Sequence, residues 1–189
     1  MPRITEIVVL CEDQKHQGFA RRLLEKLGER FRRAPRFLKA GSGSGKHYVE
    51  KQFPVEFRAY LKRKQLMRIA LIVLIDCDVK SVEATGRKLR DSLLPEERRT
   101  FEQEDCLLVL LPKRSIETWI EFAQTGQALD EDHREKRAHP SADPAGCKSL
   151  ASQFYDWSRA NAALPPGMPP SLIRAVEALR KFEVECGEA

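Results

Sequence analysis

The sequence predicts an α/β fold, in which a mostly parallel sheet of about four strands carries helices on both faces and is followed by a helical C-terminal extension. One observation is that short, almost wholly apolar runs such as Ile69–Ile75 are typical of parallel strands buried on both faces. Another is that these runs alternate with longer segments in which apolar residues recur every three or four positions, as in amphipathic helices. This alternation favours parallel pairing, because parallel neighbours need a long crossover connection.

Each element follows from its local pattern. Apolar residues at helical spacing predict the first helix, and the mixed segment 47–65 is expected to be helical only beyond Pro54. Pro95 is expected to end a helix, and Ser171 to cap the last one. In chain order we expect a strand at 4–11, a helix at 17–33, a strand at 35–40, a helix at 54–65, a strand at 68–76, a helix at 80–94, a strand at 105–111 and helices at 148–162 and 171–184.

The domain organisation follows from where the strands stop. We expect a single α/β core over 1–124, and over 125–189 a polar excursion followed by C-terminal helices packed on that core. The charge-dense stretch 125–148 is expected to be exposed, as an excursion or lid. Phe154 and Trp157 either pack onto the core or form a surface for a partner protein or a second copy of the chain.

Composition narrows the classes of function. The chain has 189 residues, 42% of them hydrophobic, and no apolar run approaches the roughly 20 residues that cross a bilayer, so we expect a soluble, cytoplasmic protein without membrane contact. Five scattered cysteines signal neither a disulfide framework nor a zinc site. The net charge of +5 is concentrated in the first half of the chain, which indicates either a nucleic-acid surface or the ordinary solvent faces of helices.

Acidic residues follow two of the expected strands at the point where each strand ends. Glu12-Asp13 comes after the first strand, and Asp76-Cys77-Asp78 comes after the strand at 68–76. The carboxyl ends of parallel strands share one edge of a sheet, so carboxylates that are far apart in sequence can meet there around a cation.

The order of these motifs resembles the Toprim family. The resemblance covers about residues 4–124 and rests on Glu12, the Ala40-Gly41 turn after the second strand, and Asp76 with Asp78. Within that family it is nearest to small stand-alone proteins and OLD-type nucleases, because the segment 111–119 is similar to their Glu-x-Trp helix start. The resemblance implies a Rossmann-like core, hydrolysis of nucleic-acid phosphodiesters that depends on Mg²⁺ or Mn²⁺, and work beside a separate ATPase in defence or DNA processing.

The residue types agree with this chemistry, because a hard cation takes oxygen ligands. Glu12, Asp76 and Asp78 are the first candidate ligands and catalytic residues, with Asp13 and Glu117 as further ligands. Alternatively, Glu117 is an acid near a helix N-terminus whose negative charge interacts favourably with the helix dipole.

Cationic and proton-transfer groups follow the same strand ends. Lys113 is the candidate cation near the scissile phosphate, or else an ordinary surface lysine. His16 either relays a proton or is an incidental exposed histidine.

The stretch Gly41–Lys46 is rich in glycine and serine. A phosphate-binding loop of the Walker type would need glycine at Ala40 and serine or threonine at His47, so we favour a loop that contacts a phosphate backbone. The residues expected to bind nucleic acid are Gly41, Ser42, Gly43, Lys46 and Arg114.

Three alternatives stay open. The chain is alternatively a degenerate Toprim-like subunit that binds nucleic acid or a partner protein without cutting. A receiver-like domain would use Asp76 as phosphoacceptor, and a haloacid-type phosphatase would use Asp76-Cys77-Asp78-Val79 as its nucleophile motif.

Overall fold

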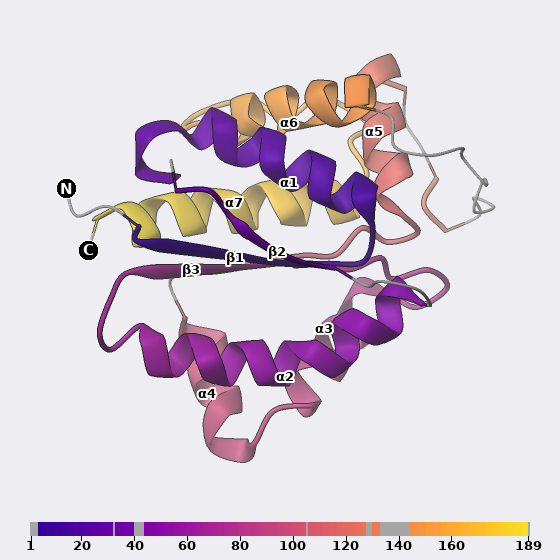
Figure 1. Ribbon diagram of the computed structural model, residues 1–189. Helices are drawn as coiled ribbons and strands as arrows, with labels where there is room; N and C mark the ends of the chain where they lie inside the picture. Colours follow the sequence, from indigo (N-terminus) through magenta and orange to yellow (C-terminus); the bar gives the residue numbers. More distant parts are fainter. Residues whose placement is uncertain are drawn as a thin grey trace.

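Four parallel strands form one sheet in the order β2-β1-β3-β4, and helices cover both of its faces (Figure 1). This computed structural model describes residues 4–31, 33–39, 44–104, 106–127, 130–132 and 144–188. The predicted fold class, an α/β protein with a Rossmann-like parallel sheet, is confirmed. The Ala40–Gly43 turn, Asp105 and most of the expected excursion lie outside the described residues.

The elements alternate along the chain until the last three helices. They are β1 (Glu6–Cys11), α1 (Gln14–Leu27), the 3₁₀ turn η1 (Gly28–Phe31), β2 (Arg36–Lys39), α2 (Gly45–Arg63), β3 (Ile69–Leu74), α3 (Val82–Asp91), α4 (Pro95–Gln103), β4 (Leu107–Leu110), α5 (Ile116–Thr125), α6 (Pro144–Ser158) and α7 (Pro170–Glu188).

Strand register brings the carboxyl ends of β1 and β3 level with each other. Cys11, the last residue of β1, pairs with Leu74, the last residue of β3, and Leu74 pairs in turn with Leu110 of β4. The residues that follow each strand therefore leave the sheet at one edge. This edge holds Glu12 and Asp76.

The two faces of the sheet bury separate apolar layers. Alternate strand residues such as Ile7 and Val9 pack with α1, α5, α6 and α7, whereas Val8 and Leu10 pack against α2. Figure 1 shows α1, α6 and α7 on one side of the sheet and α2, α3 and α4 on the other.

The C-terminal helices belong to the first of these layers. Phe154 on α6 lies edge-on to Phe19 and stacked with Trp119, and Trp157 contacts Phe122. Phe154 and Trp157 are buried, so these aromatic side chains pack onto the core. The division of the chain at residue 124 stays a prediction.

Several expected helix boundaries are wrong. Helix α1 begins at Gln14, not at 17, because the Asp13 side chain accepts hydrogen bonds from the amides of Lys15 and His16. Helix α2 begins at Gly45 and keeps Pro54 in its interior. Burial of Phe53 and its neighbours against the sheet outweighs the hydrogen bond that a proline removes.

The expected elements do not include helix α4, because Pro95 is expected only to end the helix before it. Pro95 is the first residue of α4, where an absent amide hydrogen costs nothing. The Glu97 carboxylate accepts a hydrogen bond from the Leu94 amide, 2.8 Å away, which fixes the start of the helix.

The expectation of no disulfide is also wrong. Cys106, beside β4, is bonded to Cys186 near the end of α7, with their Cα atoms 4.9 Å apart and a sequence separation of 80. The other cysteines, Cys11, Cys77 and Cys147, are buried thiols outside this disulfide. Packing of α7 brings the two bonded cysteines together, so their spacing in the sequence does not predict the disulfide.

None of the described helices is long and apolar enough to span a membrane.

Candidate functional site

The ends of β1 and β3 are joined by a hydrogen bond. The backbone amide of Asp76 donates to Oε1 of Glu12 at 2.7 Å. Glu12 follows β1 directly, so the parallel register described above places its carboxylate beside the β3 end. The structure thus brings together two of the acids that the sequence assigned to one site.

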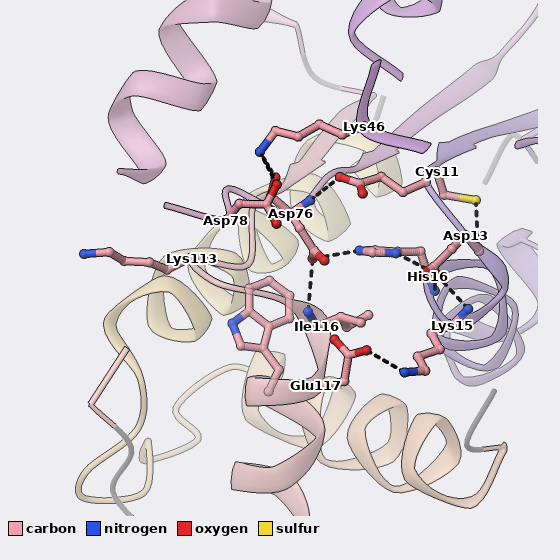
Figure 2. Close-up of polar contacts among 12 residues, drawn as sticks. Cys11, Asp13, Lys15, His16, Lys46, Asp76, Asp78, Lys113, Ile116 and Glu117 are labelled. Atoms are coloured by element: carbon pink, nitrogen blue, oxygen red, sulfur yellow. Dashed lines mark hydrogen bonds and ion pairs between the residues drawn. The ribbon is translucent and has the colours of Figure 1, made fainter. Parts of the chain in front are cut away.

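Asp76 is held from a second direction by α5. The residue is only 4% exposed, and Oδ1 accepts a hydrogen bond from the amide of Ile116, the first residue of α5, at 3.0 Å. The same oxygen lies 3.0 Å from Nε2 of His16 (Figure 2). The orientation of the Asp76 carboxylate is therefore fixed by two separate elements.

His16 lies between two carboxylates and is fully buried. Its Nδ1 is 2.8 Å from Oδ1 of Asp13, and its Nε2 faces Asp76. Burial by itself would lower the pKa of His16, but the charges of Asp76 and Asp13 outweigh burial and raise the pKa to about 10. The imidazole is then protonated at neutral pH and donates to both acids. The incidental exposed histidine considered above is therefore wrong.

Asp13 serves two partners through one oxygen. Its Oδ1 caps α1 and also accepts from His16. Burial would raise the pKa of Asp13, but the hydrogen bond and charge of His16 hold the pKa well below its usual range. A signal for this arrangement was present in the sequence, since a capping aspartate puts the residue three positions later next to it.

Glu12 is an acid whose pKa the site shifts into the neutral range. Burial raises the pKa of Glu12 to about 7, and the negative charge of Asp76 adds to this effect. The charge of His16 and the hydrogen bond from the Asp76 amide oppose the rise. A cation beside Glu12 would favour its ionised form.

Lys46 reaches the same strand end from α2. Its Nζ lies 2.6 Å from the backbone oxygen of Asp76 and 2.9 Å from Oδ2 of Asp78 (Figure 2). Asp78 adopts a left-handed backbone conformation, with φ of 56°, in the turn after β3.

Gly45 allows α2 to start this close to β1. A Cβ atom at Gly45 would lie 2.5 Å from the backbone oxygen of Glu12, closer than a Cβ atom can approach an oxygen. The start of α2 is thus packed directly on the Glu12 backbone. Of the loop residues expected to bind nucleic acid, Gly41, Ser42 and Gly43 lie outside the described residues.

Glu117 lies at the same edge, as the sequence predicts, and is paired with a lysine. Oε1 of Glu117 lies 2.5 Å from Nζ of Lys15 (Figure 2). Burial would raise the pKa of Glu117, but the hydrogen bond from Lys15 lowers the pKa below its ordinary value.

Lys113 and Arg114 contact the excursion. Lys113 forms an ion pair with Asp132, and Arg114 donates to the backbone oxygens of Glu131 and Asp132. In Figure 2 Lys113 points away from Asp76. These two cations therefore do not lie against the carboxylates described above.

The donor set suits a hard cation, since Glu12, Asp76 and Asp78 offer carboxylate oxygens at adjoining strand ends. In the part of the chain that the structure describes, no three acidic, histidine or cysteine side chains are already gathered as a metal site. The ammonium group of Lys46 lies between oxygens of Asp76 and Asp78.

Comparisons of the chain with protein-family models, curated proteins and solved structures found no match.

Proposed function

We propose that the protein is a nuclease that hydrolyses nucleic-acid phosphodiesters with Mg²⁺ or Mn²⁺ bound at the ends of β1 and β3. The supporting observation is the hydrogen bond from the Asp76 amide to Oε1 of Glu12 at 2.7 Å, which holds the Glu12 carboxylate beside Asp76 at the end of β3. Burial, and after it the charge of Asp76, raises the pKa of Glu12 to about 7, and a bound cation would favour the ionised form. The Toprim resemblance points to the same residues and the same reaction.

Glu12, Asp76 and Asp78 would hold the ion. When bound, a divalent ion supplies charge stabilisation at the phosphate and a water of lowered pKa. His16 and the Ile116 amide fix the Asp76 carboxylate in one orientation, and the Asp76 amide does the same for Glu12. Asp13 contacts His16 and Glu117 contacts Lys15, so the role of these two acids is to position His16 and Lys15.

The same geometry is less suited to a phosphorylated aspartate. Both the receiver-like and the haloacid-type alternatives need Asp76 to attack phosphorus, yet this residue is 4% exposed and one of its carboxylate oxygens is already engaged by His16 and Ile116. A metal ligand that is held in one orientation fits these contacts better.

The test combines metal binding with cleavage. Titration calorimetry with Mn²⁺ is expected to show binding by the wild type, and at least about tenfold weaker binding by Glu12→Gln and Asp78→Asn, which keep side-chain shape. Asp156→Asn, an exposed acid on α6, is the matched control and is expected to bind as the wild type does. DNA and RNA oligonucleotides, single- and double-stranded, are then incubated with each protein and Mg²⁺, with a chelator as the blank.

A wild type that neither binds Mn²⁺ nor cuts any of these oligonucleotides would overturn the proposal. Cleavage that survives the chelator would overturn the metal dependence. Loss of cleavage in Glu12→Gln and Asp78→Asn, but not in Asp156→Asn, is the supporting result.

A second candidate function has its own observation. The Lys46 ammonium already lies between oxygens of Asp76 and Asp78, as a cation would in a subunit that needs no metal. Such a subunit would bind nucleic acid or a partner protein without cutting. Oligonucleotide binding that is unchanged by a chelator and unaccompanied by cleavage would favour this function over the nuclease.

We also propose an ATPase as the partner protein, on the Toprim resemblance to OLD-type systems. Affinity purification from the native host is expected to recover a nucleotide-hydrolysing protein. Recovery of none would count against this partner and would leave the metal-binding proposal to its own test.

A further inference from the structure

Lys46 is placed where a second cation would compete with it. Its ammonium nitrogen lies 2.6 Å from the Asp76 carbonyl oxygen and 2.9 Å from a carboxylate oxygen of Asp78. The Lys46 side chain is 18% exposed and that of Asp78 is 32% exposed, so solvent and a ligand can reach the pair. This contrasts with Asp76 itself, which is almost wholly enclosed.

We infer that Lys46 is a resident cation that a divalent ion displaces from Asp78, and that the released ammonium then binds the phosphate of the substrate. The inference rests on the proposed function. It adds a specific residue with two successive partners, first Asp78 and then the phosphate of the substrate.

The side chain can make this change without moving the helix. The start of α2 is packed on the Glu12 backbone at Gly45, which fixes the position of the Lys46 backbone. A lysine stem has four rotatable bonds, so the ammonium can leave Asp78 while the backbone stays in place. A phosphate held near Glu12 and Asp78 would lie within the reach of this stem.

The other lysine at the edge is less suited to the role. Lys15 is buried on the opposite side of Asp76 and is paired with Glu117 at 2.5 Å. Its pair contains no acid among the three first candidate ligands. Displacement by a metal ion therefore singles out Lys46.

Displacement predicts effects of opposite sign on metal binding and on cleavage. Lys46→Met removes the competing charge, and an exchange of one partly exposed ion pair corresponds to about fivefold tighter Mn²⁺ binding. The same variant lacks the group that binds phosphate, so cleavage is expected to fall by about 100-fold. A lysine that only stabilises the fold would not tighten metal binding when it is removed.

The experiment measures Mn²⁺ affinity by calorimetry and cleavage of an oligonucleotide for the wild type, Lys46→Met, Lys46→Arg and Lys51→Met. Lys51 is an exposed lysine on the same helix and serves as the matched control, expected to behave as the wild type. Lys46→Arg keeps the positive charge and is expected to keep Mn²⁺ affinity near that of the wild type. Thermal unfolding of each variant shows that the folded protein is being compared.

Tighter Mn²⁺ binding with slower cleavage in Lys46→Met alone supports the inference. If the wild type binds Mn²⁺ and Lys46→Met binds it equally or more weakly, the inference is overturned and the proposed function stands. Absence of Mn²⁺ binding by the wild type and by Lys46→Met overturns both. The failure of one is thus distinguished from the failure of the other.

Discussion

The two sides of the β3 end differ in burial and in the contacts that they make. On the α1 and α5 side, the fully buried His16 and the Ile116 amide hold the carboxylate of Asp76, a residue that is 4% exposed. On the α2 side, Lys46 and Asp78 form an ion pair that is partly open to solvent. The enclosed side can position a ligand but not rearrange, whereas the open side can exchange partners at little cost.

Replacing His16 tests the enclosed side and is expected to have the largest effect. His16→Gln removes a buried positive charge from between Asp13 and Asp76, which leaves the buried Asp76 and the half-exposed Asp13 uncompensated, and is expected to cost about 3 to 5 kcal/mol of unfolding free energy. Urea unfolding at pH 7 measures the loss. The control is His47→Gln, at an exposed position, with an expected change within about 0.5 kcal/mol. Equal losses in the two variants would mean that His16 carries no charge between the acids.

The pH dependence of stability tests Glu12, which adjoins both sides. Its pKa in the folded protein is about 7, above its ordinary value of 4.5, so the folded state holds this proton to higher pH than the unfolded state does. The contribution to stability is therefore complete below pH 4.5 and is lost as the pH rises to 7, by about 2 to 3 kcal/mol. The measurement is urea unfolding of the wild type and Glu12→Gln in a chelator between pH 4.5 and 7.5.

The difference between these two proteins isolates Glu12, because the other titrating groups are common to both. Unfolding free energies that stay parallel across this pH range would contradict the raised pKa. Addition of Mg²⁺ is expected to stabilise the wild type more at pH 7 than at pH 5, since the ion binds the ionised carboxylate.

The contact between Gly45 and Glu12 tests how α2 joins the enclosed side. Gly45→Ala would place a Cβ atom 2.5 Å from a backbone oxygen, so either the helix or β1 must shift, at a cost of about 2 kcal/mol. Gly18→Ala in α1 is the control, because its Cβ would lie at an ordinary 3.5 Å from the Cys147 sulfur. Alanine in a helix interior is expected to leave stability unchanged or to raise it slightly. Similar thermal unfolding of the two variants would show that the Gly45 contact is not tight.

The residues that share this edge of the sheet could largely be predicted from local sequence, because each strand end has its own local pattern. The apolar runs before Glu12 and Asp76 predict two parallel strands, and parallel strands share an edge wherever they lie in the sheet. The same holds for Glu117, which follows a strand end at the start of a helix. The fold class needs no more than this alternation of patterns.

Contacts that depend on how helices pack could not be predicted in this way. His16 becomes an ion-paired core residue only because α1 packs with its start against the β3 end, and Cys106 meets Cys186 only because α7 lies along β4. Lys113 is predicted at the site because it follows a strand end, but its side chain forms an ion pair with Asp132 instead. Sequence position gives the edge on which a side chain starts, and tertiary contacts decide where it points.

Replacing Asp78 tests the open side and is expected to have the smallest effect on stability. Asp78→Asn removes the charge that pairs with Lys46 but keeps a residue type that tolerates the left-handed conformation, so the loss should be below about 1 kcal/mol. Asp78→Ala loses the same charge and adds backbone strain of about 1 kcal/mol more. Urea unfolding of both variants separates charge from conformation. If Asp78→Asn instead destabilised the protein as much as His16→Gln does, the Lys46 pair would be part of the rigid framework, and its exchange for a metal ion would no longer be a low-cost step.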